Sequence, residues 1–227
     1  MNAATELIVE QLEIGPMQNY VYVVGSAHSR EVALVDPAWD IDGLLAHLAE
    51  RDYKLTAALV THYHQDHVGG AIRGMAIAGL RELMAASPVK VYVNKAEADG
   101  LKKVTGLSDS DLARVDSGDT LSLGGIEIEF LHTPGHTPGS QCFRIRDTLV
   151  SGDTLFIQGC GRVDLPGSDP EQMYRSLDKL RALPDQTILL PGHNYSSVPN
   201  ATMGEVKRHN AYLRVRDIDL WRQMMGV

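Results

Sequence analysis

The amino-acid sequence predicts an α/β protein in which two β-sheets pack face to face and helices cover the outside. Short runs of β-branched and aromatic residues occur as a block in each half of the chain, and segments with helical spacing accompany each block. Elements in this arrangement typically pack as layers around one shared core. The 227 residues contain no stretch with the composition of a linker, so a single domain over residues 1–227 is expected.

The opening third of the chain predicts four strands and one helix. Four runs have the composition typical of strands: residues 6–14, 19–25, 31–37 and 56–62. Between the last two runs, Ile41, Leu44, Leu45 and Leu48 repeat with the spacing of the buried face of a helix. Asp40 stands directly before this helix and is a suitable N-cap.

The segment from Gly69 to Leu80 leaves two interpretations open. Its small residues are typical of a tightly packed helix, but they would also permit a mobile flap over a site. A strand is predicted over residues 90–94. The polar stretch that follows it is predicted to be helical to about residue 115.

The second half repeats the pattern of short strands broken by Gly, Pro or Asp. Strands are predicted within residues 121–132, 140–146, 148–153 and 187–193. A capped helix is predicted between the last two of these runs, over residues 168–183. The chain is expected to end in a further helical segment.

The composition excludes several classes of protein. No apolar stretch approaches the roughly 18 residues that a membrane-spanning helix needs. With 21 basic and 29 acidic residues, the net charge of -8 disfavours nucleic acid and anionic membranes as partners. The N-terminus has no signal-peptide pattern, so a cytoplasmic protein is expected. Cys142 and Cys160 are expected to be reduced thiols.

A dense cluster of possible metal ligands follows the fourth predicted strand: His62, His64, Asp66 and His67. Side chains alternate along an extended segment, so His62 and His64 point to the same side. The chain is then expected to turn into a helix at Asp66 and His67. Two pairs of ligands are therefore offered within six residues, at the end of a strand that can hold them rigidly.

Three further strand-like runs also end in His or Asp. His136, Asp153 and His193 each have a neighbouring glycine that allows the backbone to approach closely. Any one of them alone would be typical of a structural residue. Together with the first cluster they give five histidines and two aspartates. That donor set suits Zn, Fe or Mn and is sufficient for two adjacent ions that share a carboxylate.

The series of motifs resembles the metallo-β-lactamase superfamily over nearly the whole chain. Within it, GCGR at 159–162, EQMYRSL at 171–177 and PGHNY at 191–195 are similar to the glyoxalase II (hydroxyacylglutathione hydrolase) branch. The resemblance implies an αββα sandwich of two mixed sheets flanked by helices. It also implies a short form, because the C-terminal helical substrate domain of the long enzymes is absent.

The resemblance further implies a ligand set and a reaction. A first ion would be held by His62, His64 and His136, a second by Asp66, His67 and His193, and Asp153 would bridge them. Two divalent metal ions are implied, with zinc as the first choice and iron or manganese as alternatives. Asp66 and Asp153 would be catalytic residues because they hold these ions. The implied reaction is hydrolysis of a small-molecule thioester such as an S-acylglutathione, by attack of a metal-bridging hydroxide.

Two positions are implied in substrate binding by the same resemblance. Arg162 and Tyr195 match positions that contact glutathione in the family. Arg162 would alternatively form a surface ion pair, and Tyr195 would alternatively serve packing. Because the substrate domain is absent, the identity of the thiol carrier stays open, and the oligomeric state is not predicted.

A second interpretation is a dioxygenase of the same superfamily. GCGRVD at 159–164 is similar to the GCGRTD stretch of persulfide dioxygenases, in which two His and one carboxylate hold a single iron. Here that triad would be His62, His136 and Asp153, and the other ligands would be its hydrogen-bonding partners. The reaction would then be oxidation of glutathione persulfide. The number of metal ions per chain separates the two interpretations.

Overall fold

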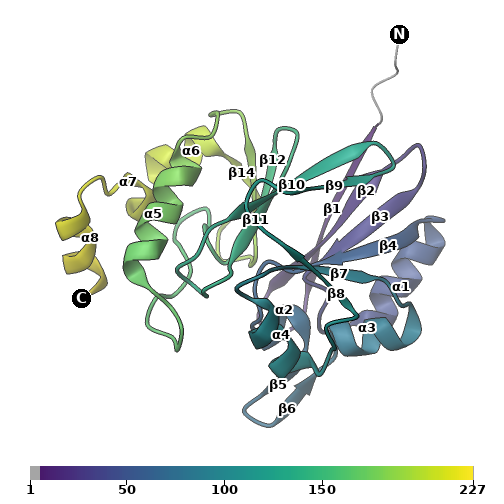
Figure 1. Ribbon diagram of the computed structural model, residues 1–227. Helices are drawn as coiled ribbons and strands as arrows, with labels where there is room; N and C mark the ends of the chain where they lie inside the picture. The colour runs from purple at the N-terminus through teal and green to yellow at the C-terminus, as the bar shows by residue number, and fades with distance from the viewer. Residues whose placement is uncertain (1–5, 227) are drawn as a thin grey trace.

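Two six-stranded β-sheets face each other in the computed structural model, which describes residues 6–226 (Figure 1). The first sheet, in spatial order, contains β1 (Leu7–Ile14), β2 (Asn19–Ser26), β3 (Glu31–Val35), β4 (Lys54–Leu59), β7 (Lys90–Asn94) and β8 (Leu112–Val115). The second contains β14 (Ala201–Thr202), β13 (Ile188–Pro191), β12 (Thr148–Gly152), β11 (Gln141–Ile145), β10 (Ile126–His132) and β9 (Thr120–Leu123). Both are mixed, because β3 pairs with β4 and β12 with β13 in parallel, whereas β1 with β2 and β10 with β11 are antiparallel.

Helices of the first half cover the outer face of the first sheet. They are α1 (Ile41–Glu50), α3 (Leu80–Ala86) and α4 (Ala98–Thr105), whose buried side chains share one core cluster with that sheet. Ile41, Leu44 and Leu48 are the buried residues of α1, as their spacing predicts. Asp40 caps this helix by accepting a hydrogen bond from the Gly43 backbone.

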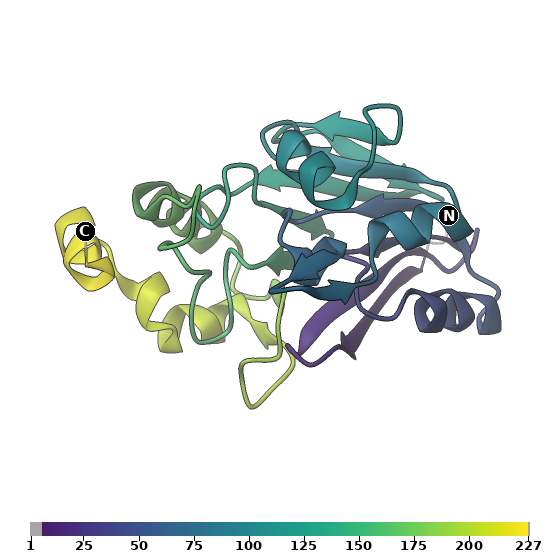
Figure 2. The ribbon, with the colours of Figure 1, turned by 90° about the horizontal axis from the view of Figure 1, so that it is seen from below.

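Helices of the second half cover the other sheet, and the last of them extends to the side of the molecule (Figure 2). They are α5 (Pro170–Arg181), α6 (Met203–His209), α7 (Ala211–Arg214) and α8 (Ile218–Met225). Trp221 of α8 is buried, and its indole N–H donates to the Pro170 carbonyl at 2.7 Å. Cys142 lies in this layer, and both cysteines are free thiols, as predicted. In the described part of the chain, no helix is long and apolar enough to cross a membrane.

The central core lies between the two sheets. Along β2, Val21 and Val23 pack beneath the helices of the first half. Tyr22 and Val24 point the opposite way and join Phe130 of the second sheet. This alternation explains why the β2 sequence is apolar at nearly every position, since both of its faces are buried. The order of layers confirms the predicted αββα sandwich, while one domain over 1–227 stays a prediction.

Residues 70–77 do not form the predicted helix, because they form a β-hairpin, and the mobile flap stays a prediction. Its strands are β5 (Gly70–Ile72) and β6 (Met75–Ile77), and it lies beside α2 (Gln65–Val68) and α4 (Figure 1). Arg73 and Gly74 both have positive φ, 50° and 84°, as a two-residue hairpin turn requires. Strands of three residues are too short to show alternation in the sequence.

The predicted helical stretch to residue 115 is also shorter in the structure. Helix α4 ends at Gly106, which has φ 76° and terminates the helix in a left-handed conformation. The chain then continues into β8, which pairs in parallel with β7. The sequence does not predict the edge strand β8, because LARV has only two residues typical of strands, one at each end.

Candidate metal centre

The structure brings all seven predicted metal ligands together at one end of the sandwich. His62 and His64 follow β4, Asp153 follows β12, and His193 follows β13. Asp66 and His67 lie in α2, and His136 lies in the loop between β10 and β11. The two sheets are joined at this end by backbone hydrogen bonds, from Gln141 to Thr61 at 2.9 Å and from Tyr20 to Gly192 at 2.8 Å. Ligands from distant parts of the sequence are therefore fixed on one framework.

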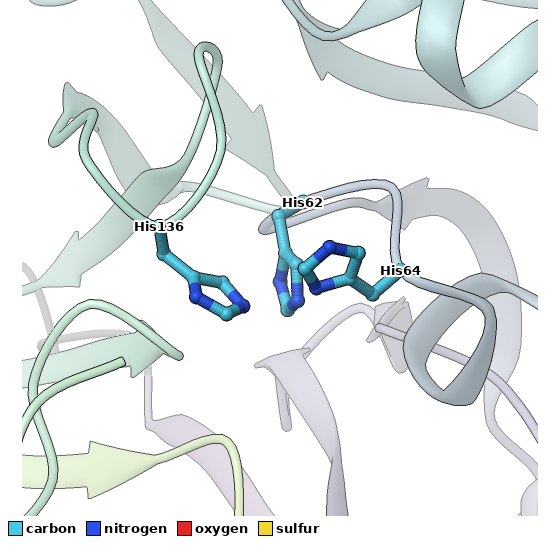
Figure 3. Close-up of side chains that lie close together, drawn as sticks. All are labelled: His62, His64 and His136. Carbon is cyan, nitrogen blue, oxygen red and sulfur yellow. The ribbon is translucent and has the colours of Figure 1, made fainter. Parts of the chain in front are cut away.

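His62, His64 and His136 form what we call the three-histidine group, and they point into the same space (Figure 3). Each offers a ring nitrogen, and these nitrogens all lie within 4.8 Å of one another. His62 and His136 are buried, and His64 is half-buried. Burial, together with the neighbouring histidines, holds the pKa of His62 well below its usual range and lowers that of His64 to about 4. The rings of His62 and His64 are therefore neutral and able to donate lone pairs.

Asp66, His67 and His193 form a second cluster, the aspartate–histidine group. Their ligand atoms also lie within 4.8 Å of one another, and the three residues are buried. The Nε2 atoms of His67 and His193 are 3.1 Å apart. Although burial lowers the pKa of His193, the carboxylates of Asp153 and Asp66 raise it to about 10. Although burial raises the pKa of Asp66, the nearby histidines bring it far below its usual range.

Hydrogen bonds on the outer side of three rings determine which nitrogen carries the proton. The Nδ1 atom of His136 lies 2.8 Å from the Arg162 carbonyl, and that of His193 lies 2.9 Å from the Met17 carbonyl. The Nδ1 atom of His67 lies 3.0 Å from an oxygen of Asp36. A carbonyl or carboxylate oxygen only accepts, so each Nδ1 donates, and Nε2 is the nitrogen left on each ring to bind a metal ion.

His62 is oriented in the same way through an intervening hydroxyl. The Thr61 hydroxyl donates to the Asp36 carboxylate, so it accepts from the His62 Nδ1 atom 3.0 Å away. The Nε2 atoms of His62 and His136 are buried without a hydrogen-bond partner. A buried lone pair without a partner is unfavourable, and these atoms therefore fit a bound metal ion.

Asp153 lies between the two groups. One oxygen is 3.4 Å from His67 Nε2, and the other is 3.4 Å from His193 Nε2 and 3.6 Å from His136 Nε2. Although burial raises the pKa of Asp153, these histidines lower it to about 2. The backbone approaches this carboxylate closely, because a Cβ on Gly192 would lie 2.3 Å from its Oδ1 atom. Only glycine therefore fits beside His193, because any side chain there would clash with Asp153.

Two supporting residues were missed from the sequence, Asp36 and Asn19. Asp36 receives hydrogen bonds from the Thr61 backbone and hydroxyl and from His67, so its oxygens orient other ligands. Asn19 donates from Nδ2 to Asp66 at 3.0 Å, and its Oδ1 accepts from the Trp39 indole at 3.0 Å. The available signal for Asp36 was its place directly after β3, a strand end like those of the ligands.

A pocket of about 590 Å³ opens onto both groups. His64, Asp66 and Asp153 are among the residues at its base. Its walls are mainly apolar and aromatic: Met17, Phe156, Leu165, Tyr195 and Tyr212. The site can therefore receive a small organic molecule directly above the metal ligands.

Both predicted substrate-binding residues line this pocket. Tyr195 is half exposed, and its ring stacks on His193 at a centroid distance of 4.6 Å and an interplanar angle of 9°. The Arg162 guanidinium is exposed and donates to both oxygens of Asp164, at 2.9 and 2.8 Å. Arg162 thus forms the predicted surface ion pair while lying in position to meet a ligand.

The chain belongs to the metallo-beta-lactamase superfamily, whose family model matches residues 14–193. It is 32% identical over 198 residues to the probable polyketide biosynthesis zinc-dependent hydrolase BaeB of Bacillus velezensis, covering 87% of this chain and 82% of the relative. It is 36% identical over 211 residues to the hydroxyacylglutathione hydrolase of Pseudomonas savastanoi pv. phaseolicola, covering 90% of this chain and 73% of the relative.

A solved structure agrees with the fold. The crystal structure of ETHE1 from Myxococcus xanthus superposes with a TM-score of 0.81 at 29% identity, covering 96% of this chain and 90% of that chain. These likenesses confirm the predicted superfamily and glyoxalase II-like branch. They also confirm the predicted class of enzyme, a metallo-hydrolase.

Proposed function

We propose that this chain hydrolyses the thioester of a small acylated thiol, such as an S-acylglutathione, at a centre of two metal ions. The observation that carries the proposal is the convergence of the three-histidine group and the aspartate–histidine group on one pocket, with Asp153 between them. The similarity to a hydroxyacylglutathione hydrolase and to a zinc-dependent hydrolase supports it.

In this proposal each group would hold one ion, and Asp153, whose oxygens lie near histidines of both groups, would contribute a carboxylate to the centre. The donor atoms are histidine nitrogens and carboxylate oxygens, which suit zinc first and also accept iron or manganese. The neutral rings of His62 and His64, and the unpartnered Nε2 atoms of His62 and His136, fit such an ion. The Nε2 atoms of His67 and His193, 3.1 Å apart and next to the Asp66 carboxylate, fit a second one, because the Nδ1 atoms of both rings are already held by hydrogen bonds to other groups.

When bound, the two ions supply a water molecule of lowered pKa as the nucleophile and positive charge for the developing oxyanion. The residues of the chain hold that chemistry in place. Asp36 and the Met17 carbonyl keep His67 and His193 in the tautomer that presents Nε2. The thiol that leaves has a pKa of about 8.5, so it departs as a thiolate without a dedicated acid.

The pocket walls would orient the substrate. Tyr195, fixed by stacking on His193, and Phe156, 5.5 Å from Tyr195, offer an aromatic surface to the acyl group or thiol arm. Arg162 is proposed to exchange Asp164 for a carboxylate of the substrate. Such an exchange costs little, because an exposed ion pair contributes little stability.

A mono-iron persulfide dioxygenase is the second candidate. It is favoured by the GCGRVD segment, since Cys160 and Arg162 of that segment both line the pocket. Its iron would be held by His62, His136 and Asp153. This candidate leaves the aspartate–histidine group without an ion, although its ligand atoms converge as closely as those of the three-histidine group, and we therefore place it second.

Elemental analysis of the protein as purified, with assays of thiol release from S-lactoylglutathione, tests the proposal. We expect about two ions per chain and release of free thiol. If glutathione persulfide drives oxygen consumption while thioesters remain intact with zinc, iron and manganese, the proposal is wrong. The cytoplasmic location stays a prediction.

A further inference from the structure

The carboxylate of Glu97 is fully buried and lies between the two loops that carry the three-histidine group. Its Oε1 atom accepts hydrogen bonds from the Tyr63 backbone and the Thr137 hydroxyl, both at 2.7 Å. Its Oε2 atom accepts from the Gly139 backbone, also at 2.7 Å. A single side chain thus receives three donors from two loops that are far apart in the sequence.

These donors stand next to the ligands. Tyr63 is the residue between the two histidines of the first loop, and Thr137 directly follows His136. The second loop approaches closely, since a Cβ on Gly139 would lie 2.6 Å from the Glu97 Oε2 atom. Because both loops are bonded to the same carboxylate, its position, together with the backbone bond from Gln141 to Thr61, fixes how far His136 lies from the other two histidines.

Glu97 occupies an unfavourable environment for an acid. Burial raises its pKa to about 7, although the hydrogen bonds from Thr137, Tyr63 and Gly139 lower it. Within residues 6–226, no ion pair compensates its charge. Burying a carboxylate costs free energy that an apolar side chain of similar volume would not. Packing alone therefore does not account for an acid here.

We propose that Glu97 is a positioning residue that sets the spacing of His62, His64 and His136 for metal binding. The inference rests on the proposed metal centre, but it does not depend on which substrate is hydrolysed. Glu97 does not line the pocket and is not a ligand. It acts on the ion through the loops, so its effect is confined to the three-histidine group.

The test measures Co²⁺ binding to the metal-free full chain in two backgrounds. Asp66→Ala weakens the aspartate–histidine group and leaves the three-histidine group to be titrated. His64→Ala does the reverse. Glu97→Gln is then added to each, because glutamine keeps the shape of the side chain but replaces one acceptor oxygen with an NH₂ group that faces a donor.

In the Asp66→Ala background, we expect Glu97→Gln to weaken Co²⁺ binding by about 10–100-fold, the usual effect of losing a residue that orients metal ligands. The visible absorption of bound Co²⁺ should change as well, because the ligand spacing changes. In the His64→Ala background, Co²⁺ affinity should be unchanged. A difference between the backgrounds is not expected from a general loss of stability.

Glu205→Gln is the matched control. Glu205 also accepts a backbone N–H, from Thr202 at 2.9 Å, but it does so in the capping box of α6. It should leave Co²⁺ binding unchanged in both backgrounds. Circular dichroism shows whether each variant is folded.

Thr137→Val provides a milder change if Glu97→Gln does not fold. It removes the hydroxyl that donates to Glu97 and that also contacts the Ser140 hydroxyl, and we expect weaker Co²⁺ binding in the Asp66→Ala background only. Thr137→Ser keeps the hydroxyl and should restore binding.

Three outcomes would overturn the inference: equal affinity with and without the substitutions, an equal loss in both backgrounds, or no Co²⁺ uptake by the wild-type chain. A wild-type chain that binds Co²⁺ but cleaves no thioester would refute the proposed substrate alone.

Discussion

The three-histidine group and the aspartate–histidine group lie side by side, yet opposite electrostatics surround them. In the first, burial and the neighbouring rings lower the pKa of His62 and His64, so neutral donors face the metal position. In the second, the carboxylates of Asp153 and Asp66 outweigh burial and raise the pKa of His193 to about 10. The first group presents neutral donors to a cation, whereas in the second the negative charges of Asp66 and Asp153 attract one.

The two groups also differ in how the chain supports them. The three-histidine group joins two loops, and its spacing depends on the shared carboxylate of Glu97. The aspartate–histidine group is supported from strand ends, where Asp36 orients His67 and Asn19 orients Asp66. Substitutions at Glu97 or Asn19 should therefore change one group and spare the other, whereas Asp36 reaches both groups through His67 and Thr61.

The largest expected effect comes from Asp66→Ala. Removing this carboxylate should lower the metal count from about two ions per chain to about one. It should also slow thioester hydrolysis by several kcal/mol in barrier terms, about 1,000-fold or more. Elemental analysis and thiol release, measured on the same preparation, check both.

A folded Asp66→Ala variant that keeps the wild-type metal count and much of the rate would contradict the division into two sites. That result would favour the mono-iron centre, in which Asp66 is only a hydrogen-bonding partner. Circular dichroism controls for unfolding. His67→Ala should behave in the same way, because it removes another ligand of the same group.

The sequence predicted the ligands better than it predicted their supports. His62, His64 and His136 carry a local signal, because each follows a strand-like run, and His136 also stands beside a glycine. Glu97 carries none, since a glutamate in a polar stretch is typical of a solvated surface. Its burial arises from contacts with loops near residues 63 and 137, which only the tertiary fold brings together.

The same distinction holds for the fold. The sequence predicts strands such as β2 because the residues of the strand themselves have the length and composition typical of a strand. The hairpin of β5 and β6 was missed because three-residue strands show no alternation, and β8 because pairing with β7 stabilises it as an edge strand. Elements that depend on a partner are the ones that local patterns do not reveal.

The next largest effect is expected from Asn19→Ala. It removes the 3.0 Å hydrogen bond to Asp66, and a bond to a charged group contributes about 1.5–3 kcal/mol, or about 10–100-fold in affinity. Co²⁺ binding to the aspartate–histidine group should weaken by that factor in the His64→Ala background. In the Asp66→Ala background, Asn19→Ala should have no effect, and a similar loss there would show that Asn19 acts on the whole centre.

Arg162→Ala should change substrate binding without changing either metal group. The carbonyl of residue 162 that orients His136 is retained, so the metal count should stay at the wild-type value. We expect KM for S-lactoylglutathione to rise about tenfold, at the lower end for a charged hydrogen bond because the side chain is exposed. Arg175→Ala is the control, since Arg175 is a similarly exposed partner of Glu171 outside the pocket. If the two variants have equal KM values, Arg162 does not bind the substrate and serves only as the ion-pair partner of Asp164.

The smallest expected effect, and the finest test of the comparison, is that of Trp39→Phe. Trp39 has φ 74°, a conformation that is unfavourable for a bulky residue, and its indole N–H holds the Asn19 Oδ1 atom at 3.0 Å. The indole only donates and a carboxylate only accepts, so together they fix the amide with Nδ2 toward Asp66.

Phenylalanine has the same backbone cost and retains an aromatic ring, so the substitution removes chiefly the N–H. The Asn19 amide can then turn its oxygen toward Asp66, which repels it. Losing a neutral hydrogen bond costs about 0.5–1.5 kcal/mol, so Co²⁺ affinity of the aspartate–histidine group should fall about 2–10-fold, with the three-histidine group unchanged. Trp221→Phe removes an indole N–H that donates to Pro170 in the helical layer, and it should have no such effect. If the two tryptophan variants bind Co²⁺ alike, the orientation of Asp66 does not depend on Trp39, and the support of this group ends at Asn19.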